Sequence, residues 1–107
     1  MALKPLVFEV LLALVDQPRH GWSLVREIEE RLGGEPLLPG NFYRTLRRLL
    51  SDGLIEETAQ PDDSDSGDER RRYFRLTREG ERVARDEARR LATLVADART
   101  HRLLKAR

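Results

Sequence analysis

The segment LPGNFYRTLRRLLSDGLIEE, residues 38–57, is the most informative part of the chain for the fold, because it contains an amphipathic helix together with both of its boundaries. Its large apolar residues recur at helical spacing, which predicts a helix from about Gly40 to Asp52 that packs by one side. Gly53, just beyond it, is a typical helix stop. The packing side comprises Phe42, Leu46, Leu49 and Leu50, and the opposite side comprises Asn41, Arg44, Arg47, Arg48 and Ser51.

Two further helices are expected before this stretch. The first, Leu3 to Val15, is apolar nearly all round, so it must be covered on more than one side. A chain of 107 residues has few elements that can do this, and we therefore expect a second subunit to cover it. The second helix, about Gly21 to Leu32, has one apolar stripe and ends at Gly33-Gly34.

Two strands and a long helix are expected after it. Leu54–Thr58 and Arg72–Leu76 have the composition of strands, and the Asp-, Ser- and Gly-rich segment 59–70 predicts a long hairpin loop between them. Thr77 can cap a final helix that runs to about Leu104. Small and apolar residues recur along this helix at spacings of four and three, which is typical of two helices packed along their length.

This order of elements is typical of a winged helix-turn-helix, a mainly α fold with a small β-hairpin. We expect one compact unit, with a DNA-binding domain over residues 1–76 and a dimerisation helix over residues 77–107. Arginines on one side of the third helix can neutralise phosphates or pair with guanine edges, and the base of the hairpin can contact the adjacent backbone. The expected DNA-binding residues are Asn41, Tyr43, Arg44, Arg47, Arg48, Arg70, Arg71 and Arg72.

Three stretches of the chain resemble the PadR family of transcriptional regulators. LVFEVLLALVDQPRHGWSLVREIEERLG, residues 6–33, is similar to the family's opening pair of helices, and residues 38–57 are similar to its recognition stretch. DERRRYFRLTREGERVARDEARRLATL, residues 68–94, resembles its wing strand and dimerising helix, and the single C-terminal helix is similar to the shorter branch of the family. The resemblance implies a homodimer that binds a two-fold symmetric operator in double-stranded DNA, usually as a repressor.

Two features depart from the family's pattern. Trp22 stands at the helix junction, where the family more often has tyrosine. The hairpin tip is acidic where the family usually has lysine or arginine, and carboxylates beside a phosphate backbone would repel it. We therefore expect the tip to point away from DNA or to be disordered, and the base of the hairpin to make the contact. The acidic residues of the tip are Asp62, Asp63, Asp65, Asp68 and Glu69.

The expected dimer has an energetic basis. Each core-type Leu or Val left in water costs about 1.5–3 kcal/mol. Several such residues would rival the whole stability of a small domain, about 5–15 kcal/mol, so we expect a monomer that is poorly stable alone. The expected interface residues are Leu6, Val10, Leu14, Ala84, Ala88, Leu91, Leu94, Val95 and Ala98.

Two other interpretations stay open. A winged helix can also serve as a protein-interaction or scaffold module without DNA binding, and the arginines would then face solvent or an acidic partner. A small-molecule effector is also compatible with the resemblance, which implies a pocket at or near the dimer interface. The residues that would line this pocket are Phe8, Leu12, Leu91 and Val95, which the plainer interpretation assigns to the interface core.

Composition excludes several other classes of protein. The chain has no cysteine, which excludes disulfides and thiolate chemistry. Its net charge is only +1, which by itself says little about binding to nucleic acid. The apolar run at residues 6–15 is too short to span a bilayer, and no signal-peptide pattern is present, so we expect a cytoplasmic protein. A partial match to the calcium-binding loop of an EF-hand occurs at Asp63, Asp65 and Gly67, but the glycine lies one position too early. We therefore expect a flexible, solvated loop and no calcium site. Neither His20 nor His101 has a second metal-ligating residue or a catalytic base at a recognisable spacing in the sequence, so we expect no metal, no cofactor and no enzymatic activity.

Overall fold

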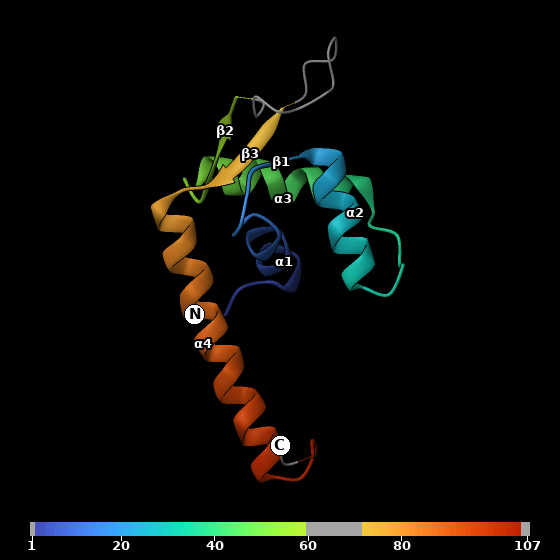
Figure 1. Ribbon diagram of the computed structural model, residues 1–107, viewed down its shortest axis with the longest axis vertical. Coiled ribbons are helices and arrows are strands. Elements are labelled where there is room, and N and C mark those ends of the chain that lie inside the picture. The colour runs from blue at the N-terminus through green and yellow to red at the C-terminus, as the bar shows by residue number, and fades with distance from the viewer. Residues whose placement is uncertain (1, 60–71, 106–107) are drawn as a thin grey trace.

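The computed structural model describes residues 2–59 and 72–105. Figure 1 shows α1 in the middle of the molecule, with α2 and α3 beside it and α4 leading away from the sheet. This is the predicted fold class, mainly helical with a small sheet, and the largest difference from the predicted bounds is that α4 ends at Thr100 instead of Leu104. The elements are α1 (Pro5–Ala13), β1 (Arg19–His20), α2 (Gly21–Arg31), α3 (Pro39–Ser51), β2 (Ile55–Thr58), β3 (Tyr73–Leu76) and α4 (Arg78–Thr100).

The core forms around α1, which packs against α2, α3 and α4 of the same chain. Val10 and Leu11 of this helix are completely buried. The expectation that a second subunit must cover α1 is therefore wrong, because helices of the same chain cover it. Three expected interface residues, Val10, Leu14 and Ala84, belong to this core, so their side chains are not available to a partner. The argument for an unstable monomer loses its main support.

The sheet has the antiparallel strand order β1-β3-β2. β2 and β3 form the predicted hairpin, in a register that pairs Ile55 with Leu76 and Thr58 with Tyr73. On the other side of β3, Arg19 pairs with Phe74 and His20 pairs with Tyr73. The sequence does not predict β1, because a strand of two residues has no alternating pattern and exists only through its partner. This pairing holds the start of α2 beside the hairpin.

The start of α4 is fixed to the turn that follows α3. The Thr77 N–H donates to the Leu54 carbonyl at 3.1 Å, and the Thr77 hydroxyl donates to the Gly53 carbonyl at 2.6 Å. The same hydroxyl accepts the Gly80 N–H at 3.0 Å, which confirms Thr77 as the cap of this helix. Gly80 packs so closely on Leu54 that a Cβ would lie 1.9 Å from the Leu54 carbonyl oxygen.

A buried carboxylate lies on the inner side of α4. Glu87 is only 4% exposed and accepts two hydrogen bonds from Arg90, from Nε at 2.8 Å and from Nη2 at 2.7 Å. These bonds lower the pKa of the Glu87 carboxyl more than its burial raises it, and the backbone N–H of Leu3 lowers it further. The charged form of Glu87 therefore holds the N-terminal segment against α4.

We expect Glu87→Gln to lower the midpoint of thermal unfolding at pH 7 and to lower it by a smaller amount near pH 3. A carboxyl whose pKa is lower in the folded chain adds stability above its unfolded pKa, about 4.3, and loses it as the pH falls through the folded value. Circular dichroism melts at both pH values measure this. Glu81→Gln, which breaks an exposed pair with Arg85, is the control and should change neither melt appreciably. An equal loss at both pH values would contradict a role for the charge.

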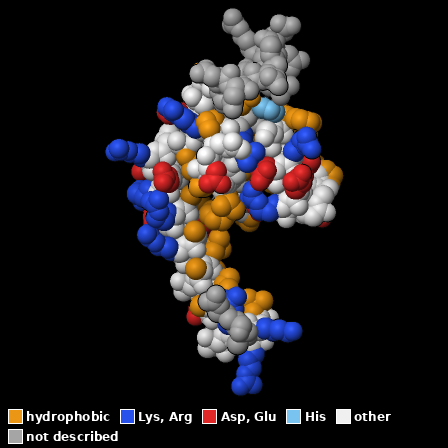
Figure 2. Space-filling view, in the orientation of Figure 1, with side chains coloured by type: hydrophobic (Ala, Val, Ile, Leu, Met, Phe, Trp, Pro, Cys, Tyr) orange, Lys and Arg blue, Asp and Glu red, His pale blue; other side chains and the backbone are white. Residues whose placement is uncertain are grey.

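The C-terminal part of α4 leaves the core. Its buried residues, Gly80, Ala84 and Glu87, all lie in its first half, and the molecule is elongated, with extents of 54 × 29 × 28 Å. Figure 2 shows hydrophobic side chains gathered on the inner side, where α4 meets the rest of the chain, and continuing along α4. Within residues 2–59 and 72–105, no helix has the length and apolar character needed to cross a membrane.

Candidate nucleic-acid interface

Helix α3 divides into a buried side and an exposed side, as its sequence predicts. Pro39 starts the helix, where its missing N–H costs no hydrogen bond. Phe42, Leu46 and Leu49 are buried in the core and fix the rotation of the helix about its axis. All five residues expected to contact DNA from this helix are therefore exposed together: Asn41, Tyr43, Arg44, Arg47 and Arg48.

Two of the three arginines have partners on α3 or at its end. Arg44 Nη2 donates to Asn41 Oδ1 at 2.6 Å, and Arg48 Nε donates to Asp52 Oδ2 at 3.2 Å. Both contacts are exposed, so they are weak and can be exchanged for a phosphate at small cost. Arg47 makes no hydrogen bond or ion pair with any described residue. It is therefore the arginine of this helix that an incoming anion can bind without breaking a contact.

The base of the hairpin contributes one described arginine. Arg72 binds Glu57 of β2 through both its Nε, at 3.0 Å, and its Nη2, at 2.6 Å. These hydrogen bonds lower the pKa of the Glu57 carboxyl and raise that of the Arg72 guanidinium. To bind a DNA phosphate, Arg72 must therefore break at least one of its hydrogen bonds to Glu57 or bind both groups at once. The other expected wing residues, Arg70 and Arg71, and the acidic tip lie outside the described residues.

A hollow of about 500 Å³, here called the main hollow, opens between the start of α2, α3 and β3. Two expected DNA-binding residues of α3, Tyr43 and Arg47, line it, and so does Arg72. The sequence reasoning did not assign Trp22 to this site, although its side chain is 63% exposed and borders the hollow. No local sequence signal places Trp22 there, because the hollow is lined by residues of α2, α3 and β3 that are far apart in the chain.

His20 shapes the helix junction, as expected. Its Nδ1 accepts the Ser23 N–H at 3.2 Å and so caps α2. Its ring stacks on Trp22, with centroids 6.4 Å apart, and meets the edge of Tyr73 at 5.4 Å. These contacts help to hold the Trp22 ring at the rim of the main hollow. His101 is exposed at the end of α4.

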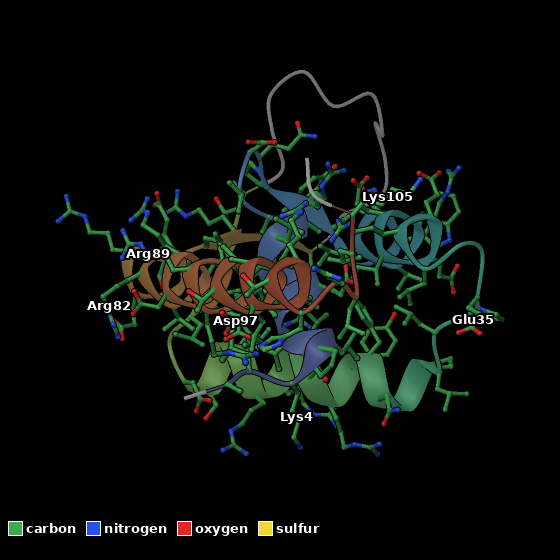
Figure 3. The ribbon with its side chains drawn as sticks, turned by 90° about the horizontal axis from the view of Figure 1, so that it is seen from below. Lys4, Glu35, Arg82, Arg89, Asp97 and Lys105 are labelled. Atoms are coloured by element: carbon green, nitrogen blue, oxygen red, sulfur yellow. The ribbon has the colours of Figure 1, made fainter. Side chains whose placement is uncertain are left out.

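A second hollow of about 720 Å³ lies on the other side of Arg47, between α3 and the N-terminal segment. It brings Lys4 together with the three arginines of α3, and Lys4 was not among the expected contacts. Figure 3 shows Lys4 beside α3, whereas Arg82 and Arg89 point away from α4 at another edge of the molecule. The exposed side of α3 is therefore positive along its length, with four cations in one surface.

The residues expected at a dimer interface divide into two groups. Apart from the three in the core, Leu94 is 50% and Val95 is 38% exposed, Ala88 is exposed, and Leu6, Leu91 and Ala98 are half-buried. The expected effector pocket stays a prediction: Phe8 is half-buried and Leu12 exposed on α1, which packs against α4. Within the described residues, no cluster of His, Asp or Glu has the arrangement of a metal site.

The chain matches one known protein family and is similar to many solved structures. Residues 10–86 match the model of the transcriptional regulator PadR-like family. A PadR family transcription regulator from hypervirulent Clostridium difficile R20291 is similar in structure, with a TM-score of 0.77 and 23% identity, over 92% of this chain and 98% of that one. A PadR family transcriptional regulator from Eggerthella lenta DSM 2243 has a TM-score of 0.69 and 30% identity, over 95% of this chain and 83% of that one.

A third similar structure contains nucleic acid. It is Bacillus subtilis PadR in complex with operator DNA, with a TM-score of 0.62 and 19% identity, over 78% of this chain and 46% of that one. At this identity the similarity shows a shared fold. No curated protein sequence matches the chain.

Proposed function

The chain belongs to the PadR-like family of transcriptional regulators, and on this premise we propose that it binds a two-fold symmetric operator in double-stranded DNA as a homodimer and represses transcription. The observation that carries the proposal is the exposed side of α3, where Arg44, Arg47 and Arg48 project together from a helix whose other side is locked in the core. Such a helix fits the major groove, and its cations can bind phosphates and guanine edges.

The proposed homodimer rests on the part of α4 that lies beyond the core. Leu94 and Val95 are exposed there, and within the described residues nothing buries them. A second copy of α4 would cover this surface in a symmetric contact. Residues 1–76 would then bind DNA and residues 77–107 would dimerise. The two copies of α3 would lie about 34–36 Å apart, or a multiple of this, as successive major grooves on one side of DNA require.

Arg47→Ala and Arg44→Ala test the DNA interface directly. Each is expected to weaken binding to a selected operator duplex about tenfold, within the range of about 1–3 kcal/mol typical of such contacts. If the arginine binds a phosphate, the slope of log affinity against log salt should also fall by about one. The operator is first selected from a random duplex pool, and affinity is then measured by fluorescence anisotropy at several salt concentrations.

Arg85→Ala is the matched control, because Arg85 is an exposed arginine of α4 that pairs with Glu81 and lies outside the proposed interface. It should leave both the affinity and the salt slope unchanged. Unchanged duplex affinity in both α3 variants would remove the mechanism of the proposed regulator. The arginines would then be assigned to solvent or to an acidic protein surface, as in an interaction module.

A further inference from the structure

We propose that Lys4 binds a DNA phosphate opposite the arginines of α3, and that the buried Glu87 of α4 holds Lys4 in position through Leu3. This inference rests on the function proposed above and adds a second wall to its DNA interface. The wall is formed by the start of α1 and by the N-terminal segment before it, residues 2–4. The sequence places all the expected DNA contacts elsewhere, on α3 and at the base of the hairpin.

The second hollow, of about 720 Å³, has cations on both of its walls. Lys4 lies on one wall, beside α3 (Figure 3), and the three arginines of α3 lie on the other. The described lining contains no carboxylate. A helix in the major groove is flanked by the phosphates of both DNA strands, so a groove beside α3 with cations on both walls fits a stretch of one backbone.

The ammonium group of Lys4 is available to a phosphate. The side chain is exposed and makes no hydrogen bond or ion pair with any described residue. Several cations of α4, in contrast, pair with a carboxylate of their own helix: Arg82, Arg85, Arg89 and Arg90. A lysine ammonium is a compact charge with three donors, and here it can bind a phosphate oxygen without breaking another contact.

The backbone on both sides of the Lys4 side chain is fixed. Pro5, the first residue of α1, favours an extended conformation in the residue before it, and Lys4 has φ −63° and ψ 143°. The Lys4 carbonyl accepts the Phe8 N–H at 3.2 Å. The side chain therefore leaves the backbone at a defined point, and less conformational freedom is lost when its end binds a phosphate.

Glu87 holds the other neighbour of Lys4. Leu3 packs against the core, and its N–H donates to the Glu87 carboxylate. The same carboxylate accepts Arg90 Nε at 2.8 Å and Nη2 at 2.7 Å, and Leu3, Glu87 and Arg90 border one hollow against α4. Glu87 is only 4% exposed, so it acts as a positioning residue that connects α4 to the wall carrying Lys4.

Lysine footprinting tests the contact directly, because Lys4 and Lys105 are the only lysines of the chain. The full chain is methylated with formaldehyde and a borohydride, with and without the selected operator duplex, and mass spectrometry measures the modification of each lysine. The duplex should slow the modification of Lys4 about tenfold when about nine-tenths of the protein is bound. Lys105, which follows the far end of α4, should be modified at the same rate in both samples. Equal modification of Lys4 in both samples would overturn the contact.

Lys4→Gln removes the charge and should weaken duplex binding about fivefold at about 0.15 M salt, because one phosphate is no longer neutralised. The slope of log affinity against log salt should fall by about one. Lys105→Gln is the matched control and should change neither the affinity nor the slope. Sedimentation checks that both variants keep the assembly state of the parent. An unchanged slope in folded Lys4→Gln would remove Lys4 from the interface.

Glu87→Gln tests the positioning role by the sign of its effect on DNA binding. The amide offers one acceptor oxygen to the three donors that meet at Glu87, so it should hold Leu3 less firmly. Loss of a negative charge should by itself strengthen DNA binding slightly, as in the matched variant Glu81→Gln. Glu87→Gln should instead weaken binding about threefold, less than the whole contribution of the Lys4 contact.

This weakening should disappear in a chain that already carries Lys4→Gln, because Glu87 acts through Lys4. All measurements are made well below the melting temperature of every variant. Equal weakening in both backgrounds, or none in either, would overturn the positioning role. Binding that falls in Arg47→Ala but not in Lys4→Gln overturns the Lys4 contact alone, whereas a parent chain that binds no duplex contradicts the proposed function itself.

Discussion

Gly80→Ala is expected to lower the free energy of unfolding by about 3 kcal/mol, the upper end of the usual cost of overpacking. The added Cβ would lie 1.9 Å from the Leu54 carbonyl oxygen and 2.9 Å from its carbon. Both are backbone atoms, so no flexible side chain can move aside to make room. The start of α4 would have to shift away from the turn after α3. Urea unfolding followed by circular dichroism measures this loss as a lower midpoint at unchanged slope.

Gly40→Ala is the matched control for this prediction. Gly40 also lies in the first turn of a helix, but the nearest atom to an added Cβ is the end of the Arg44 side chain at 4.0 Å. In helices alanine is favoured over glycine by roughly 0.5–1 kcal/mol, so this variant should be as stable as the parent or slightly more stable. If Gly80→Ala unfolds at the same urea concentration as Gly40→Ala, the contact between α4 and Leu54 is not as close as described.

Val95→Asp is expected to weaken the proposed homodimer about 10²–10⁴-fold. Burying a valine contributes about 1.5–3 kcal/mol, and in a two-fold symmetric contact each substitution counts twice, giving about 3–6 kcal/mol. Val95 lies outside the core, so the monomer should keep its fold. Sedimentation velocity over a range of protein concentrations measures the dissociation constant, and circular dichroism checks the helical content.

Thr93→Asp is the matched control, because Thr93 is exposed on the opposite side of α4, two residues away. It adds the same charge and should leave the dimer intact. A parent chain that sediments as a stable monomer at micromolar concentration would contradict the dimer itself. Equal weakening by both substitutions would show that the added charge acts through net repulsion, and would remove Val95 from the interface.

The helices and the hairpin could be predicted because their signals are local. The 42–46–49 apolar spacing, Gly53 and the Thr77 cap each act within a few residues, and the structure confirms their consequences. The exposed side of α3 follows from the same spacing, since a buried Phe42 leaves Arg44 and Arg48 outside. This part of the candidate interface could therefore be predicted from the sequence of α3 alone.

The errors concern contacts between distant elements. The all-round apolar character of α1 predicts correctly that it is covered, but the pattern does not say whether the cover is α4 of the same chain or a partner. For that reason the sequence predicts a dimer interface at Val10, Leu14 and Ala84, whereas all three lie in the core of a single chain. Trp22 and Lys4 were missed because the hollows they line are each built from separate segments of the chain.

The contacts of Thr77 and Gly80 with the turn at Leu54 fix the start of α4, so these contacts set the angle at which the helix leaves the rest of the molecule. A helix of this length, about 34 Å, moves its far end by about 6 Å when it tilts by about 10° at its start. In a homodimer joined near that far end, a small tilt would change the distance between the two copies of α3. Substitutions at Thr77 or Gly80, which lie outside the proposed DNA interface, would then change the spacing of operator half-sites that the dimer binds.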